Sequence, residues 1–362
     1  MFVAWRDLKF AKGRFALMGT AIVLITLLVG LLSGLTAGLG RQNTSAITSL
    51  PADAIAFDAP GAGEEPSYAN STVEEGQWRR WARTPGVDGA EPLGITTTRA
   101  SAGAGSAGVS AFGVRPGSVL APLGDRIDGR AAVLSTAAAA DLGVETGDAL
   151  TLAGQEVTVA AVSGDAFFSH TPVVWTSLDL WRRIAPPTGG ADAPTATVIV
   201  LDTAPGADLG AADRAAGTRT VSTDESLSAI GSYASENGSL QLMRGFLFAI
   251  SALVIGAFFT VWTIQRSGDV AVLKALGAST AGLLEDALGQ AAVLLAGGTL
   301  VGTGLAAGVG ALLAGSAVPF LLTPATVLPP AAVMIALGLL GAALSVRRIT
   351  SVDPLTALGS AR

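Results

Sequence analysis

Eight polar side chains and one methionine lie in the sequence beside the ends of two long apolar segments. Three follow the first segment and six precede or open the second: Arg41, Gln42 and Asn43, then Tyr233, Glu236, Asn237, Gln241, Met243 and Arg244. If the two segment ends meet, these residues form one polar ring. A phenolate, a carboxylate or a thioether in that ring can ligate iron, and an arginine can pair with carboxylates. The chemistry that such a ring could perform is recognition of an amphipathic anion that carries a metal.

We expect one subset of this ring to bind the ligand. Glu236 and Tyr233 are the preferred metal ligands because anionic oxygen suits ferric iron better than the thioether of Met243 does. Haem fits this chemistry. The alternative is an interfacial belt in which Tyr233 and Arg244 only anchor a membrane helix. The predicted binding residues are Tyr233, Glu236, Met243, Arg244, Arg41 and Asn237.

Motifs that would make the chain an enzyme are missing from the sequence. A P-loop needs a lysine followed by serine or threonine, and none of the three lysines is so followed. The G-x-S-x-G motif is absent, cysteine is absent, and His170 is the single histidine. We therefore expect no catalytic residue and no resident metal site. For His170, a structural hydrogen bond in a loop beside Pro172 is favoured over haem ligation.

The composition indicates a membrane protein with two differently charged parts. Half of the 362 residues are hydrophobic, only 14% are charged, and the mean hydropathy is +0.55, which is too apolar for an ordinary soluble protein. Residues 41–240 hold 12 arginines, no lysine and 23 acidic residues, whereas the remainder holds 10 basic and 5 acidic residues. An acidic middle and basic ends indicate two compartments.

Four apolar segments are long enough to span a bilayer. Basic residues flank them on one side only, which places both termini in the cytosol and the large acidic domain outside the cell membrane. These basic residues are Arg6, Lys9, Lys12, Arg14, Arg266, Lys274, Arg347 and Arg348. The predicted division is a cytosolic amphipathic helix 1–14, span 15–40, extracytoplasmic α/β domain 41–240, span 241–265, cytosolic loop 266–282, span 283–314, outer loop 315–329, span 330–346 and cytosolic tail 347–362.

Two further patterns position these elements. Gly30, Gly34 and Gly38 repeat a G-x-x-x-G spacing in the first span and predict a face that packs helix to helix, unless they are ordinary glycine enrichment. In the external domain, apolar runs predict strands at Ala54–Phe57, Val157–Val162, Val173–Trp175 and Thr197–Leu201 and helices at Thr72–Ala82, Thr136–Leu142 and Leu178–Ile184. Small-residue stretches predict loops at Ala100–Gly108 and Pro186–Ala193.

The segment from Gln265 to Ser279 predicts a short amphipathic helix in the cytosol, which ends at Gly277. Its sequence resembles the E-[IV]-[AG]-[VI]-L-[KR]-A-[LI]-G-[AM] loop of FtsX/MacB-type ABC-transporter permeases, with Asp269 where glutamate is usual. The runs VLSTAAAADLGVETGDALTLAGQEVTVAAV and RRITSVDPLTALG resemble the external domain and the cytosolic end of the same family. The contact residues that the resemblance implies are Asp269, Val270, Leu273, Lys274, Leu276 and Gly277.

The resemblance implies one span, a large external domain and then three spans. It also implies a homodimer that works in the lipid membrane with two copies of a separate ATPase, which binds ATP and magnesium. No nucleic acid is expected as a partner. The length and the segment SHTPVVWTSLD resemble most the haem-efflux permeases of Gram-positive bacteria. The alternatives are an FtsX-like signalling subunit that controls an external partner and a permease that handles peptides or lipoproteins.

Overall fold

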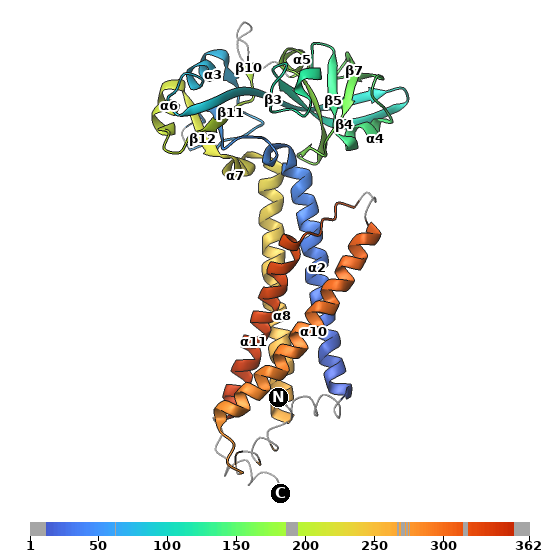
Figure 1. Ribbon diagram of the computed structural model, residues 1–362, viewed down its shortest axis with the longest axis vertical. Helices are drawn as coiled ribbons and strands as arrows, with labels where there is room; N and C mark the ends of the chain where they lie inside the picture. Colours follow the sequence, from blue (N-terminus) through green and yellow to red (C-terminus); the bar gives the residue numbers. More distant parts are fainter. Residues whose placement is uncertain are drawn as a thin grey trace. The chain divides into compact units, whose positions relative to one another are not determined.

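The computed structural model describes residues 12–61, 63–185, 195–265, 268, 272, 274, 276–313 and 318–350 (Figure 1). The chain divides into two compact units. The membrane unit comprises the chain up to Gly38 and from Ser239 onward, and the external unit comprises Leu39–Gly238.

Four helices among the described residues are long and apolar enough to cross a membrane: α2 (Lys12–Thr48), α8 (Gly231–Gln265), α10 (Thr280–Leu313) and α11 (Pro324–Thr350). The first two extend past the predicted span limits at residues 40 and 241. The external unit contains the last ten residues of α2, Leu39–Thr48, and the first eight residues of α8, Gly231–Gly238. Most of these residues are polar or small, which suits helix ends outside the apolar spans.

The glycine face of α2 contacts two different kinds of neighbour within the membrane unit. At Gly30, an added Cβ would lie 2.8 Å from the Cβ of Ala306 in α10, so a helix packs there. At Gly34, an added Cβ would lie 2.5 Å from Cζ of Phe320, and at Gly38 it would overlap the carbonyl of Pro319. Helix-to-helix packing is therefore wrong for Gly34 and Gly38, because the extended segment before α11 fills the groove that they leave.

The start of α11 also differs from the prediction. The fourth span was expected to begin at Pro330, with prolines breaking the outer connection, but α11 begins at Pro324 and contains Pro329 and Pro330. Proline suits the first position of a helix because the missing N–H has no helical acceptor there. The hydroxyl of Thr323 accepts a hydrogen bond from the amide of Thr326 at 3.3 Å and caps this end.

The external unit is built on a ten-stranded sheet in the order β12-β1-β11-β3-β4-β9-β5-β7-β6, with β8 paired to β9 (Figure 1). An additional pairing of β3 with β6 closes six of these strands, β3-β4-β9-β5-β7-β6, into a ring. The strands are β1 (Ala54–Asp58), β3 (Val87–Ala102), β4 (Gly105–Val114), β5 (Ala131–Leu134), β6 (Ala149–Leu152), β7 (Gln155–Val162), β8 (Phe167–Phe168), β9 (Thr171–Ser177), β11 (Val198–Thr203) and β12 (Thr218–Ser222), and β2 (Val73–Glu74) pairs with β10 (Thr195–Ala196).

Short helices connect the strands of this unit. The predicted helices at Thr136–Leu142 and Leu178–Ile184 are found as α4 and α5, and each is capped by a serine that accepts a backbone hydrogen bond, Ser135 and Ser177. The predicted helix 72–82 is shorter, because its first residues form β2. The remaining helices are α3 (Glu75–Trp81), α6 (Leu209–Ala216), α7 (Thr223–Ser226) and two 3₁₀ turns, Gly124–Arg126 and Leu227–Ala229.

The predicted loop at Ala100–Gly108 is wrong. These residues belong to the β3–β4 hairpin, which pairs Ala102 with Gly105, so only its tip is a turn. The predicted strands in the external domain are all found, with ends shifted by one or a few residues. The predicted loop Pro186–Ala193 lies outside the described residues.

Two hydrophobic clusters hold the external unit together. In one, Trp181 of α5 packs directly on β3 and β4, because Gly94 and Gly113 leave no side chain between the ring and the strands. In the other, Tyr68 contacts Phe57 and Phe168 with ring centroids 4.9 and 5.5 Å apart. Burial raises the pKa of the Tyr68 phenol above its ordinary value, although a hydrogen bond to Ser226 partly opposes the shift.

Candidate functional site

A polar cluster joins the outer ends of α2 and α8 to the turn between β8 and β9, and all of it lies in the external unit. The Nε2 atom of His170 lies 2.9 Å from both carboxylate oxygens of Glu236 and 2.9 Å from Nδ2 of Asn43. Nδ2 of Asn43 also donates to Oε2 of Glu236 at 3.1 Å. Asn43 and His170, which are far apart in the sequence, therefore meet at the carboxylate of Glu236.

The hydrogen-bond partners decide how these groups are oriented. A carboxylate accepts hydrogen bonds and an amide nitrogen donates them, so Nε2 of His170 must carry the proton if it is to bond Glu236. The hydroxyl of Ser232 donates to Oδ1 of Asn43 at 2.5 Å, which fixes the amide with its nitrogen toward Glu236. Glu236 thus receives two donors and keeps acceptor sites for a third group.

The turn that carries His170 is held in an unusual backbone conformation. Ser169 and His170 have φ values of 49° and 65°, a region that residues other than glycine rarely adopt. Their amides donate to the carbonyls of Asn43 and Gln42, each at 3.0 Å. These bonds fasten the turn to α2 and hold the imidazole beside Glu236.

Further polar contacts surround the cluster. Nη2 of Arg41 lies 3.3 Å from the carboxylate of Asp165, whose other oxygen accepts a hydrogen bond from Thr136 at 2.5 Å. The hydroxyls of Ser169 and Ser232 lie 2.9 Å apart. Arg41 is consequently paired within the protein, and its charge is less available to a ligand than the sequence indicates.

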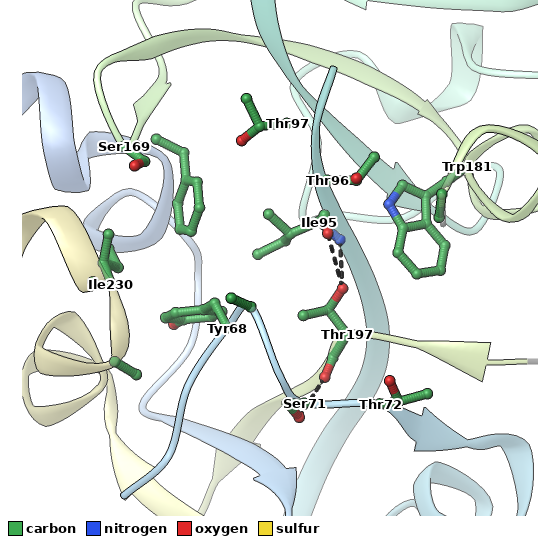
Figure 2. Close-up of a pocket in the computed structure, with 15 residues that line it drawn as sticks. Tyr68, Ser71, Thr72, Ile95, Thr96, Thr97, Ser169, Trp181, Thr197 and Ile230 are labelled. Atoms are coloured by element: carbon green, nitrogen blue, oxygen red, sulfur yellow. Dashed lines mark hydrogen bonds between the residues drawn. The ribbon is translucent and has the colours of Figure 1, made fainter. Parts of the chain in front are cut away.

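Ser169 also borders a cavity of about 350 Å³ in the external unit (Figure 2). Ile95, Thr96 and Thr97 follow one another along the strand that crosses the view, with Tyr68 and Ile230 on one side and Trp181 on the other. The Thr197 hydroxyl bonds the backbone of Ile95, and the indole N–H of Trp181 has no hydrogen-bond partner among the described residues. The residues that line this cavity carry no charge.

The structure brings together only part of the predicted binding set. Arg41, Tyr233, Glu236 and Asn237 belong to the external unit, and Glu236 is the one among them at the centre of the cluster; Tyr233 packs partly buried against an aromatic core. Met243 and Arg244 belong to the membrane unit, where Met243 is 52% exposed.

The predicted ATPase-contact segment is partly described. Gly277 has a φ of 95°, and its amide donates to the carbonyl of Lys274 at 3.0 Å, as expected where a helical turn ends. Leu276 is 80% exposed. Asp269, Val270 and Leu273 lie outside the described residues.

Sequence reasoning missed most of the partners of Glu236. Asn43 was placed in the polar ring but not among the binding residues, Ser232 was not considered, and His170 was assigned a structural hydrogen bond without a partner. A signal was present for Asn43, because an amide immediately after an apolar span needs a polar neighbour. The pairing of His170 with Glu236 joins residues 66 positions apart and had no local signal.

The family of the chain follows from two matches that together cover nearly its whole length. Residues 15–219 match the MacB-like periplasmic core domain. Residues 242–354 match the FtsX-like permease C-terminal region. The chain is an ABC transporter permease of the FtsX/MacB type. Its family implies a partner ATPase subunit, and the domain between α2 and α8 is extracytoplasmic.

Several relatives of this permease match over their full length. A protein of Staphylococcus haemolyticus named as the hemin transport system permease protein HrtB is 26% identical, with 99% of each chain covered. An uncharacterized ABC transporter permease of Mycobacterium tuberculosis is also 26% identical with 99% of each chain covered. Among solved structures, the periplasmic region of MacB from Actinobacillus actinomycetemcomitans is 11% identical, with a TM-score of 0.36 and coverage of 49% of this chain and 92% of that one.

Proposed function

We propose that this permease exports haem, or a similar amphipathic metal-bearing anion, as a homodimer driven by two copies of a separate cytosolic ATPase. The ATPase binds and hydrolyses ATP with magnesium, and the permease itself catalyses no reaction. Both termini and the 266–282 loop face the cytosol, and the helices are surrounded by membrane lipid. The relatives named for hemin transport support the cargo.

The observation that carries this proposal is the environment of Glu236. The Glu236 side chain is 40% exposed, and its carboxylate is held by His170 and Asn43. Groups that hydrogen-bond a metal ligand fix its direction and tune its basicity. An oriented carboxylate with free lone pairs suits ferric iron, so Glu236 is the proposed ligand, and His170 and Asn43 are its positioning residues.

The other predicted residues have secondary roles in this proposal. Tyr233 is the alternative oxygen ligand, and Met243 offers a weaker thioether. Arg244 holds a carboxylate of the cargo in preference to Arg41, because Arg41 is paired with Asp165. Asn237, which follows Glu236 on α8, is the remaining residue proposed to bind the cargo.

Coupling to the ATPase uses the segment that ends at Gly277. The exposed apolar side chain of Leu276 is a contact that a partner protein can bury. ATPase motion passed through this segment moves the helices that lead to the external domain, which acts as a lever that opens and closes the cargo site.

The test is a titration of the purified full-length protein with haemin, followed by visible absorption. The wild type gives a saturable Soret shift, and alanine at Glu236, Tyr233, Met243 or Arg244 weakens binding, with Glu236→Ala the most severe. Glu156→Ala is the matched control, because Glu156 is an exposed carboxylate on β7. Cells that carry the weakened variants become sensitive to haemin.

Two results would overturn parts of this proposal. The absence of a saturable shift in the wild type would reject haem and favour a signalling subunit of the FtsX type. A normal shift in all four alanine variants would keep haem but place its site elsewhere.

A further inference from the structure

The membrane unit contains a cavity of about 370 Å³ formed by α2, α8 and α11. On α2 and α8 it lies close in sequence to Leu39 and Gly238, the limits of the external unit. The cavity is therefore on the outer side of the membrane unit, near the depth of lipid head groups. Its lining residues are Ser33, Thr36, Ala37, Arg244, Phe248, Ala325, Thr326, Pro329, Pro330 and Val333.

Two residues that line this cavity carry hydroxyls without a hydrogen-bond partner in the described part of the chain. Ser33 is 4% exposed, and its Oγ and the Oγ1 of Thr36 are both buried. A serine or threonine within a helix often bonds the carbonyl four residues earlier, as Thr260 and Thr263 do in α8. No such bond is found for Ser33 or Thr36, so both hydroxyls are unsatisfied within the described residues; because each oxygen has almost no accessible surface, donation to a ligand requires the side chain to rotate toward the cavity.

Arg244 adds a positive charge on the wall that α8 forms. Its Nη2 donates to the neutral amide oxygen of Gln241 at 2.8 Å. No carboxylate of the described residues pairs with this guanidinium. An uncompensated cation beside two hydroxyl groups favours an anionic ligand, and phosphate is an anion that arginine binds well.

Helix α11 forms the third wall of the cavity and supplies hydrogen-bond acceptors. Pro329 and Pro330 lack an N–H, so the carbonyls of Ala325 and Thr326 lose the donors that would bond them four residues later in α11. A ligand that fits the whole cavity therefore carries hydroxyl donors as well as an anion. A phosphate-linked glycerol meets both demands, whereas the carboxylate arm of a porphyrin has no hydroxyl to donate.

We infer that this cavity binds the head group of an anionic, hydroxyl-bearing phospholipid from the outer leaflet. The phosphate accepts hydrogen bonds from Arg244, Ser33 and Thr36, and the glycerol hydroxyls donate to the carbonyls of Ala325 and Thr326. The acyl chains stay in the bilayer. Arg244 is also the residue proposed to hold a carboxylate of the cargo, so lipid and cargo use this guanidinium in turn.

The experiment compares lipid retention by the full-length protein. The protein is purified in detergent, exposed to equal amounts of phosphatidylglycerol and phosphatidylcholine, and analysed by native mass spectrometry. The wild type retains phosphatidylglycerol in preference. Arg244→Gln and the double variant Ser33→Ala with Thr36→Val reduce that preference about tenfold or more, the scale of hydrogen bonds to a charged group.

Thr26→Val is the matched control, because the Thr26 hydroxyl is also buried on α2, has no partner among the residues that the structure describes, and does not line the cavity. It retains the wild-type preference. Equal retention of the two lipids by the wild type, or a wild-type preference in both test variants, would overturn the inference. Haemin should displace the lipid from Arg244 and haemin dimethyl ester should not, because the proposed cargo carboxylate uses the same guanidinium; failure of haemin to displace the lipid would contradict the role of Arg244 in cargo binding and not the lipid site.

Discussion

Gly34 lies so close to Phe320 that the structure predicts whether a substitution at Gly34 raises or lowers the stability of the protein. A Cβ added at Gly34 would lie 2.5 and 2.7 Å from two ring carbons of Phe320. These separations are about 1 Å shorter than the 3.5–4.0 Å at which carbon atoms attract each other. The same glycine holds the segment in place, because its carbonyl accepts the amide of Leu321 at 3.0 Å.

Two opposing effects decide the outcome of Gly34→Ala. Overpacking a well-filled site costs about 1–3 kcal/mol, whereas replacing glycine by alanine inside a helix gains up to about 1 kcal/mol of helix propensity. Gly19 lies on the same helix with nothing within 4 Å of an added Cβ, so Gly19→Ala shows the propensity gain alone. We expect Gly34→Ala to lower the unfolding midpoint relative to Gly19→Ala, and Gly34→Leu to lower it further.

The assay is unfolding of the purified protein in mixed micelles, extended to a double-mutant cycle. Phe320→Ala removes the ring that Gly34→Ala would strike, so the double variant should recover about 0.5–3 kcal/mol relative to the sum of the single changes. Equal midpoints for Gly34→Ala and Gly19→Ala would refute the packing argument. An interaction energy near zero would show that Phe320 does not occupy the groove.

Three other predictions follow from exposed and buried side chains. Leu276→Asp should abolish co-purification of the ATPase, because burying an unpaired charge costs several kcal/mol; Ser279→Asp places the same charge beyond Gly277, where the predicted helix ends, and should not. Because the pKa of Tyr68 is raised in the folded protein, the unfolded chain ionises first above pH 10, and stability falls by up to about 1.4 kcal/mol per pH unit there. Tyr68→Phe should remove the part of the alkaline loss of stability that comes from this phenol, as measured by the unfolding temperature in thermal scans above pH 10. His170→Ala should weaken haemin binding less than Glu236→Ala, and a wild-type affinity would show that His170 does not position the carboxylate.

Local patterns in the sequence predicted the elements whose ends are set by local chemistry. Ser135 and Ser177 cap α4 and α5, and the predicted limits of both helices match the structure. The hairpin at residues 100–108 was missed because alanine, glycine and serine carry little strand propensity. Its strands are specified instead by tertiary pairing: β3 pairs with β4 from Gly94 to Ala102, and Ala100 and Ser101 also pair with β6.

The same distinction applies to the candidate site. Glu236 could be selected because a carboxylate beside an apolar span is costly without a function or a partner. Its partners come from residues 66 and 193 positions away, and their approach depends on the whole external fold. The G-x-x-x-G spacing similarly showed that something packs closely on α2, but it did not show that Phe320 fills the groove at Gly34.

The turn at Ser169 and His170 connects the candidate site to its surroundings in a specific way. Its two amides bond α2, its histidine bonds Glu236 of α8, and its serine bonds Ser232 at the start of α8. A backbone conformation that costs about 1–3 kcal/mol per residue persists only where the surrounding contacts hold it. Separation of the two helix ends within the external unit would break those contacts and release the turn. The carboxylate of Glu236 would then lose the donors that orient it, so helix movement and ligand affinity are linked through this one turn.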